Sequence, residues 1–184
     1  SIAVVNKIKK KLDYKKQIKV IDSLKFLTET STIFRENIDA KIIAITGSCG
    51  KTTLKALLGK TLKKISKTTI SPKSYNNKYG VPLSLFNLSK NDNYGVLEVG
   101  MDKKGEIDYL SKIIKPDISV ITNINYAQAK NFKNIKDIAL AKSEIISNTK
   151  PNGFVILNAD DNFFRLHQKI AAKNNICLLY TSDA

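Results

Sequence analysis

The sequence predicts an α/β protein with a doubly wound, mostly parallel sheet, and two observations lead to that prediction. Short apolar runs rich in β-branched residues recur along the chain, and amphipathic stretches separate them. The runs are continuous rather than alternating, which is typical of strands buried on both faces. Strands that alternate with helices require right-handed crossovers, which build a parallel sheet flanked by helices. Because the chain stops directly after such a run, we expect the sheet to be incomplete at its C-terminus.

Six strands and four helices are expected from residue 22 onward. The strands are the apolar runs, which are bounded by Gly, Pro, Asn or Asp and cover residues 41–46, 68–70, 94–99, 118–122, 154–158 and 176–180. The helices are the stretches with apolar residues on one face, over residues 22–37, 52–66, 107–114 and 135–146. Asp22 would cap the first helix, and Pro116 would end the third.

The composition excludes several classes of protein. The 184 residues are 42% hydrophobic, which is enough for one ordinary domain with a buried core. No apolar run approaches the roughly 18 residues of a membrane span, and the N-terminal apolar stretch precedes its charges, the wrong order for a secretory signal. Cys49 and Cys177 are too few for a disulfide framework. We expect a cytoplasmic protein without membrane insertion.

The net charge of +15 raises the question of nucleic-acid binding. Of the 31 basic residues, only Arg35 and Arg165 are arginine, the side chain that base readout and phosphate clamps favour. The lysines are spread along the whole chain, with one cluster at residues 7–19, and they do not form a stripe interleaved with aromatic residues. This distribution indicates a solvated basic surface, so no nucleic-acid partner is expected.

The strongest motif is a glycine-rich loop that follows the first of the six strands and opens a helix. It consists of Thr46, Gly47, Ser48, Cys49, Gly50, Lys51, Thr52 and Thr53. Its backbone N–H groups and the positive end of the helix would bind phosphate oxygens. Lys51 would contact the β- and γ-phosphates of a nucleotide, and the Thr52 hydroxyl would ligate Mg²⁺. The general pattern has a glycine where Ile45 stands, so this loop is a shortened variant.

Two charged residues interrupt apolar segments. Glu98 lies near the C-terminal end of a buried strand, at the sheet edge where the phosphate loop is expected. A carboxylate at this place could hold Mg²⁺, or it could be a structural acid paired in a salt bridge. Lys142 lies in the apolar stripe of the helix at 135–146. Its amine could extend to solvent, or a buried site could match or alter its charge.

With these motifs the chain resembles the Mur ligases, the ATP-dependent amide-forming enzymes of peptidoglycan synthesis. The matching segments follow the family's order and lie at residues 44–55, 75–85, 97–110, 115–124, 137–146 and 152–161. Within the family, Gly105-Glu106-Ile107 favours the member that adds D-alanyl-D-alanine to a UDP-MurNAc-tripeptide through an acyl phosphate. The members that add other amino acids usually carry a Ser-Ser sequence after the glutamate that matches Glu98.

The resemblance implies roles for individual residues. The loop at 47–53 would bind the phosphates of ATP, and Thr52 and Glu98 would ligate the first Mg²⁺. Asn77 would lie near the reacting carboxylate of the substrate. Lys142 would carry a carbamate, an anion that bridges toward Mg²⁺. The expected catalytic set is therefore Lys51, Asn77, Glu98 and Lys142.

Two positions depart from the pattern of the family. Gln128 stands where the family usually has a histidine that helps to hold a second Mg²⁺, so this ligand is weakened or lost. Asp102-Lys103 replaces a common Asn-His pair.

The resemblance also implies that the chain covers only part of a Mur ligase. Residues 1–20 would be the remnant of an N-terminal domain that binds the UDP-linked substrate, residues 21–184 would be part of the central ATP-binding domain, and the C-terminal domain would be absent. We therefore expect an inactive fragment of a ligase that is a monomer when complete, with the sites for UDP-MurNAc-peptide and D-Ala-D-Ala largely in the missing domains. Two alternatives stay open: another Mur- or folylpolyglutamate-type ligase, and a non-catalytic nucleotide-binding module.

Overall fold

A six-stranded parallel sheet lies at the centre of the protein, with its strands in the order β4-β5-β3-β6-β7-β8. The computed structural model of the chain describes residues 2–126 and 131–181. The strands are β3 (Lys41–Thr46), β4 (Thr68–Ile70), β5 (Tyr94–Glu98), β6 (Ile118–Ile121), β7 (Phe154–Asn158) and β8 (Cys177–Thr181). Each strand lies within one residue of its predicted bounds, and the predicted doubly wound parallel sheet is confirmed.

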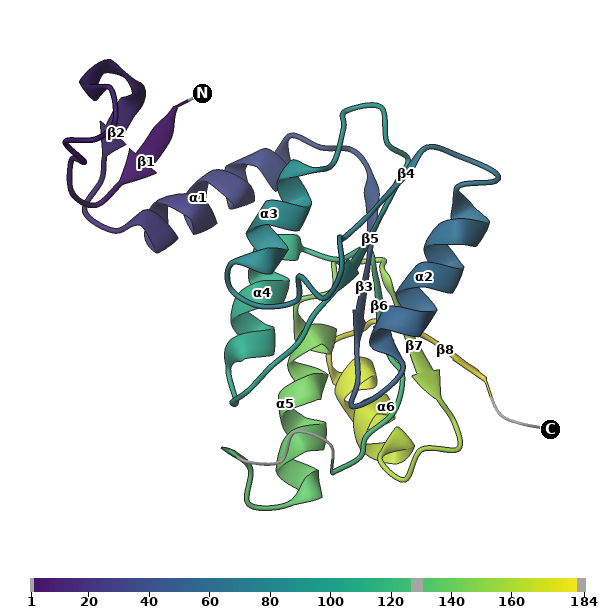
Figure 1. Cartoon of the computed structure of the whole chain (residues 1–184). Coiled ribbons are helices and arrows are strands. Elements are labelled where there is room, and N and C mark those ends of the chain that lie inside the picture. Colours follow the sequence, from purple (N-terminus) through teal and green to yellow (C-terminus); the bar gives the residue numbers. More distant parts are fainter. Residues whose placement is uncertain (1, 127–130, 182–184) are drawn as a thin grey trace.

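Helices cover both faces of this sheet (Figure 1). They are α1 (Ser23–Glu36), α2 (Lys51–Leu62), α3 (Gly80–Phe86), α4 (Glu106–Ile114), α5 (Ile135–Ser147) and α6 (Phe164–Lys173). Alternate residues of β3 point to opposite faces, so that Ile43 and Ile45 pack with α2, whereas Ile42 and Ala44 pack in the core with α3, α4 and α5. Within the described ranges, no helix is both long and apolar enough to cross a membrane.

Two helices were not predicted, and a third is shorter than predicted. The apolar pattern placed the end of α2 near residue 66, but the helix ends at Leu62 and the Ile65 side chain is 75% exposed. Helix α3 has only seven residues, and both apolar and small polar side chains on it are buried, so it shows no amphipathic period. Helix α6 was also not predicted, although Leu166 and Ile170 on it pack against the core.

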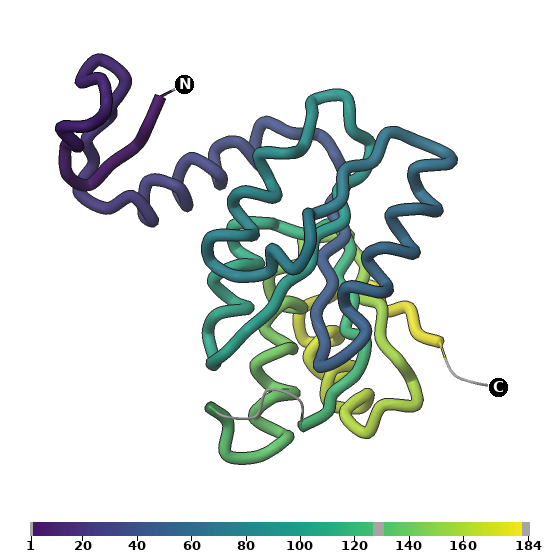
Figure 2. Tube along the Cα trace, in the orientation of Figure 1, coloured from purple at the N-terminus to yellow at the C-terminus, as the bar shows by residue number. Residues whose placement is uncertain are grey.

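The N-terminal residues form a small separate sheet that the sequence did not predict. It consists of β1 (Ala3–Val5) and β2 (Gln17–Lys19), paired in parallel and joined by the 3₁₀ helix η1 (Tyr14–Lys16). Neither strand contains a buried residue, so neither belongs to the buried apolar runs from which the six strands of the main sheet were predicted. The trace shows this lobe at the far end of α1, away from the six-stranded sheet (Figure 2). Its lysines are exposed, as a solvated basic surface requires.

A buried arginine fastens α1 to the body of the protein. Asp22 caps the helix as predicted, and its carboxylate accepts hydrogen bonds from the N–H groups of the second and third residues that follow it. At the other end, Arg35 is 3% exposed and donates to the Ile114 carbonyl oxygen at 2.7 Å and to Asp117 Oδ2 at 3.0 Å. The same Asp117 oxygen accepts the N–H of Ile42 in β3 at 2.8 Å. The Arg35–Asp117 pair thus joins α1, the end of α4 and the central strand.

The single histidine is expected to make stability fall in mild acid. His167 is 2% exposed and its Nε2 lies 3.2 Å from the Ala139 carbonyl oxygen, so the neutral ring donates this hydrogen bond. Burial lowers the pKa of His167 below its ordinary 6.5. In mild acid His167 therefore binds a proton more readily in the unfolded chain than in the folded chain. The free energy of unfolding consequently drops as pH falls below about 6.5.

Urea unfolding at steps between pH 8 and pH 5 measures this loss. His167→Gln keeps a hydrogen-bond donor but does not titrate, so its unfolding free energy should change less over this interval than that of the wild type. Equal slopes for the two proteins would assign the loss to other titrating groups, such as Lys142 and carboxylates.

Candidate active site

The glycine-rich loop lies at the carboxyl ends of the strands, between β3 and α2. Gly47 has φ of 144°, and a Cβ atom there would come within 1.9 Å of Thr122 Oγ1. Gly50 caps α2 in the left-handed conformation with φ of 79°. Glycine is therefore required at both positions, by contact at the first and by conformation at the second. The first N–H groups of α2 have no partners within their own helix and face this loop, as phosphate binding requires.

The segment that follows β6 holds the loop in place. The N–H of Ser48 donates to the Asn123 carbonyl oxygen at 2.9 Å, and the N–H of Cys49 donates to Asn123 Oδ1 at 3.0 Å. The Ser48 hydroxyl donates to the Asn125 carbonyl oxygen at 2.9 Å. The chain leaves β3 toward α2 on one face of the sheet and leaves β6 toward α5 on the other face, which is the switch point where open α/β sheets bind ligands. The structure therefore brings the loop and Asn123 together.

Two lysines share one carbonyl group of the loop. Lys51 Nζ donates to the Gly47 carbonyl oxygen at 2.8 Å, and Lys142 Nζ donates to the same oxygen at 3.0 Å. Lys142 is 2% exposed, so its amine does not extend to solvent. Burial, and next the positive charge of Lys51, lower the pKa of Lys142 to about 7. This environment therefore favours the neutral amine of Lys142.

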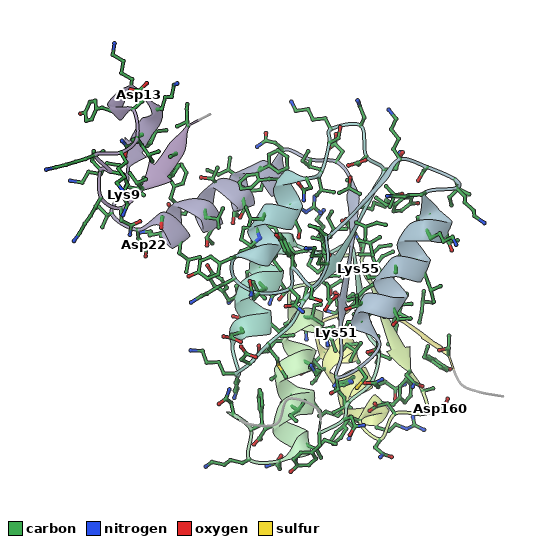
Figure 3. The ribbon with its side chains drawn as sticks, viewed as in Figure 1. Lys9, Asp13, Asp22, Lys51, Lys55 and Asp160 are labelled. Carbon is green, nitrogen blue, oxygen red and sulfur yellow. The ribbon has the colours of Figure 1, made fainter. Side chains whose placement is uncertain are left out.

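Glu98 lies at the end of β5, on the face of the sheet that α2 covers. Its carboxylate is almost fully buried; Oε2 accepts a hydrogen bond from the Thr52 hydroxyl at 2.8 Å, and Oε1 accepts one from Asn76 Nδ2 at 2.8 Å. Lys55 Nζ lies 3.4 Å from Oε2 and also donates to the Lys73 carbonyl oxygen. The structure supports both roles expected for Glu98. Thr52, the other expected ligand of Mg²⁺, lies beside its carboxylate, and Lys55 forms a salt bridge with it. Figure 3 shows Lys51 and Lys55 inside the body of the protein, far from Lys9 in the N-terminal lobe.

Asn77 lies at the edge of a cavity of about 710 Å³ beside Lys51. Its Oδ1 accepts hydrogen bonds from the N–H groups of Tyr79 at 3.1 Å and Gly80 at 2.9 Å, which caps α3. The cavity is also lined by Asn76, Lys103, Glu106 and Tyr109. The cavity thus lies between Lys51 at the start of α2 and residues of α4.

A glutamate that the sequence did not single out fixes the wall of this cavity. Glu144 on α5 accepts hydrogen bonds from the N–H groups of Gly105 at 3.0 Å and Asp108 at 3.0 Å, at the start of α4. Glu144 follows Lys142 by two positions on the same helix. One helix therefore holds both the cavity wall and the amine beneath the phosphate loop.

The oxygen ligands present suit Mg²⁺ better than a transition metal. In the described part of the chain, no three His, Cys, Asp or Glu side chains gather as a metal cluster. One carboxylate and one hydroxyl, at Glu98 and Thr52, match an ion that keeps several waters and takes its other ligands from nucleotide phosphates. Gln128, the expected weak ligand of a second ion, lies outside the described residues.

The comparisons with known proteins agree with this geometry. A family described as the Mur ligase middle domain matches residues 45–184. The chain belongs to the Mur ligase family. A UDP-N-acetylmuramoyl-tripeptide--D-alanyl-D-alanine ligase of Buchnera aphidicola subsp. Acyrthosiphon pisum (strain APS) is 44% identical over 142 residues, which cover 77% of this chain and 31% of that protein. This Mur ligase chain spans about a third of the length of the curated relatives that it matches.

Solved structures of Mur ligases have the same fold. MurF from Acinetobacter baumannii superimposes with a TM-score of 0.85 at 35% identity, over 97% of this chain and 38% of that one. MurF from Thermotoga maritima in complex with ADP gives 0.85 at 28% identity, over 98% of this chain and 41% of that one. E. coli FolC in complex with DHPP and ADP is 16% identical to this chain, and a folylpolyglutamate synthase of Mycobacterium tuberculosis is 12% identical; these likenesses show the fold alone.

Proposed function

We propose that this chain is the ATP-binding part of a ligase that adds D-alanyl-D-alanine to a UDP-MurNAc-tripeptide in the cytoplasm. The observation that carries the proposal is the meeting of the glycine-rich loop, Lys51, Thr52 and Glu98 at the switch point of the sheet. The names of the curated relatives support the choice of substrates, since several are UDP-N-acetylmuramoyl-tripeptide--D-alanyl-D-alanine ligases at 30 to 44% identity. Because the chain spans about a third of those relatives, ligation is proposed for a protein that also carries the remainder of their length.

In the proposed reaction the protein mainly positions the reacting groups and neutralises the charge of the phosphates; it forms no covalent bond to the substrates itself. Bound ATP supplies the phosphoryl group that activates the carboxylate of the UDP-linked peptide. Lys51 and the N-terminus of α2 hold and neutralise the phosphates, and Thr52 and Glu98 supply the ligands for Mg²⁺. The cavity beside Lys51 and Asn77 supports a carboxylate substrate that reaches the phosphates from the side of α4. Asn77 would then orient this carboxylate.

We also propose that Lys142 carries a carbamate in the working enzyme. Only a neutral amine reacts with CO₂, and burial of Lys142 beside Lys51 favours the neutral form. The product is an anion next to the Lys51 ammonium group, which removes the repulsion between two buried cations. The carbamate oxygens would add a negative ligand on the side of the loop opposite to Glu98.

Nucleotide binding by the chain itself tests the proposal. Lys51→Met is expected to weaken ADP binding by about 30-fold or more, because removing one partner of a desolvated charge pair costs roughly 2 kcal/mol at least. Lys60→Met changes an exposed lysine of the same helix and should bind ADP like the wild type. Calorimetric titration with Mg²⁺ and ADP measures both.

The outcomes separate the open alternatives. A wild-type chain that does not bind ADP, or a Lys51→Met chain that binds it as tightly, would contradict the site. A protein with the full length of the relatives that binds ADP but releases no phosphate with D-Ala-D-Ala would favour the non-catalytic module. Phosphate release with glutamate instead would favour the folylpolyglutamate-type ligase.

A further inference from the structure

One buried hydroxyl beside the phosphate loop has no hydrogen-bond partner within the described residues. Thr46 is the last residue of β3, its side chain is fully buried, and its Oγ1 contacts no donor or acceptor there. Nearly all buried polar atoms in proteins are paired, because leaving such an atom unpaired costs free energy. The second unpaired hydroxyl, on Ser66, belongs to a residue that is only partly buried. A fully buried, unused hydroxyl at the base of a binding loop therefore requires an explanation.

The strand places this hydroxyl on the side of Lys142. Side chains alternate along β3, and Ile45 packs with α2, so Thr46 points to the opposite face, which α5 covers. Its partner in β6 is Ile121, which packs in the same core as Ile138 and Ala139 of α5. Lys142 comes from α5 and donates to the carbonyl oxygen of the next residue, Gly47. The Thr46 side chain and the Lys142 amine thus approach the same end of β3 from the same face.

The surroundings do not otherwise call for a threonine. The other residues of β3 that point to this face, Ile42 and Ala44, are apolar, and so are the residues across from Thr46. Valine has nearly the shape of threonine and would fill this place without an unpaired hydroxyl. The hydroxyl can become useful when an acceptor with oxygen atoms is built on the neighbouring amine.

We propose that Thr46 is the positioning residue of the Lys142 carbamate, and that its hydroxyl donates a hydrogen bond to one carbamate oxygen. This inference rests on the carbamate of the proposed function. In the reaction, the neutral Lys142 nitrogen forms a bond to the carbon of CO₂, one C=O electron pair moves onto oxygen, and the nitrogen gives a proton to water. The side chain gains two acceptor oxygens and a negative charge. Lys51 donates to the same Gly47 carbonyl oxygen as Lys142, and Thr46 directly precedes Gly47 with its hydroxyl unpaired within the described residues, so these two groups can donate to the new oxygens.

Carbon NMR on the 184-residue chain tests this role directly. The chain is incubated with ¹³C-labelled bicarbonate, Mg²⁺ and ADP, and the carbamate signal is integrated for the wild type and for Thr46→Val, Thr46→Ser and Lys142→Met. The wild type and Thr46→Ser should show the signal, and Lys142→Met should lose it. Thr46→Val should need about tenfold more bicarbonate for the same occupancy, because it lacks a hydrogen bond to a charged group. Urea unfolding in CO₂-free buffer should show Thr46→Val at least as stable as the wild type, which excludes misfolding as the cause.

Each outcome bears on a different claim. Equal carbamate occupancy in Thr46→Val and the wild type would overturn the role of Thr46 and leave the carbamate in place. No signal in the wild type would overturn both the carbamate and the role of Thr46, whereas ADP binding in the same sample would leave the nucleotide site intact. Loss of the signal in Thr46→Ser as well as in Thr46→Val would show that the methyl group and the packing are what matter, which also contradicts the hydrogen bond.

Discussion

Lys142→Met is expected to raise the free energy of unfolding at pH 6 by on the order of 5 kcal/mol in CO₂-free buffer. The wild type must bury the amine of Lys142, whose pKa falls from 10.5 to about 7. This lowering of the pKa measures how much burial destabilises the charged amine relative to the neutral one. Each pKa unit corresponds to about 1.4 kcal/mol. Methionine has a similar length and no charge, so it fills the same space without this cost.

The pH dependence gives the sign of the effect. Between pH 7 and pH 10.5 the unfolded chain keeps a proton on Lys142 that the folded chain has released, so the stability of the wild type rises with pH. The gap between the variant and the wild type should therefore be largest below pH 7 and should close toward pH 10. Lys136→Met, at an exposed position of the same helix, should change stability by less than about 0.5 kcal/mol. A variant that is no more stable than the wild type at pH 6 would mean that Lys142 is not buried as a charged group.

Arg35→Met is expected to lower the free energy of unfolding by about 3–5 kcal/mol, the cost of removing one member of a buried ion pair. The change leaves the carbonyl groups at the end of α4 without their donor and leaves Asp117 without its buried partner. Asp117 keeps Lys150 at 3.0 Å, and this exposed contact is too weak to compensate. Denaturant unfolding measures the loss.

The chain offers its own control for this variant. Arg165 is the only other arginine of the sequence and is exposed on α6. Arg165→Met should therefore unfold within about 0.5 kcal/mol of the wild type. Arg35→Lys should recover only part of the loss, because an ammonium group cannot donate in the directions that the three guanidinium nitrogens use. Equal stabilities of Arg35→Met and Arg165→Met would contradict the conclusion that Arg35 holds α1 on the body of the protein.

The fold could be predicted from sequence because its signals are local and repeated. Continuous β-branched runs such as Lys41–Thr46 and Phe154–Asn158 are buried on both faces, and such runs occur in few structures other than a parallel sheet. The strands of the N-terminal lobe contain no buried residue, and helix α3 buries small polar as well as apolar residues, so neither shows a run of buried β-branched residues or an apolar face. The order of the strands comes from contacts across the sheet and was not predicted.

The sequence indicates site residues where neighbouring residues form a motif, as in the glycine-rich loop, or where a charge interrupts an apolar segment, as at Glu98 and Lys142. The glycine-rich loop could be identified because its residues are consecutive and its context is a strand followed by a helix. Lys55, Asn76 and Glu144 lie outside any motif, and they reach the site only because α2, the loop before α3 and α5 converge on it. One signal was available for Lys55, which follows Lys51 by one helical turn and therefore lies on the same face of α2. Arg35 gave no local signal, because its four partners all lie beyond its own helix.

The hydrogen bonds between the glycine-rich loop and the segment that follows β6 have a consequence for protein synthesis. Cys49 and Asn123 are 74 positions apart, and Ser48 and Asn125 are 77 apart. A ribosome adds roughly 5–20 residues per second, so the loop emerges roughly 4–15 s before the residues that hold it. During that interval the nascent chain has the glycine-rich sequence without the hydrogen bonds that fix its shape. The loop can therefore take its observed shape only after the segment that follows β6 has been synthesised, and not when the motif itself leaves the ribosome.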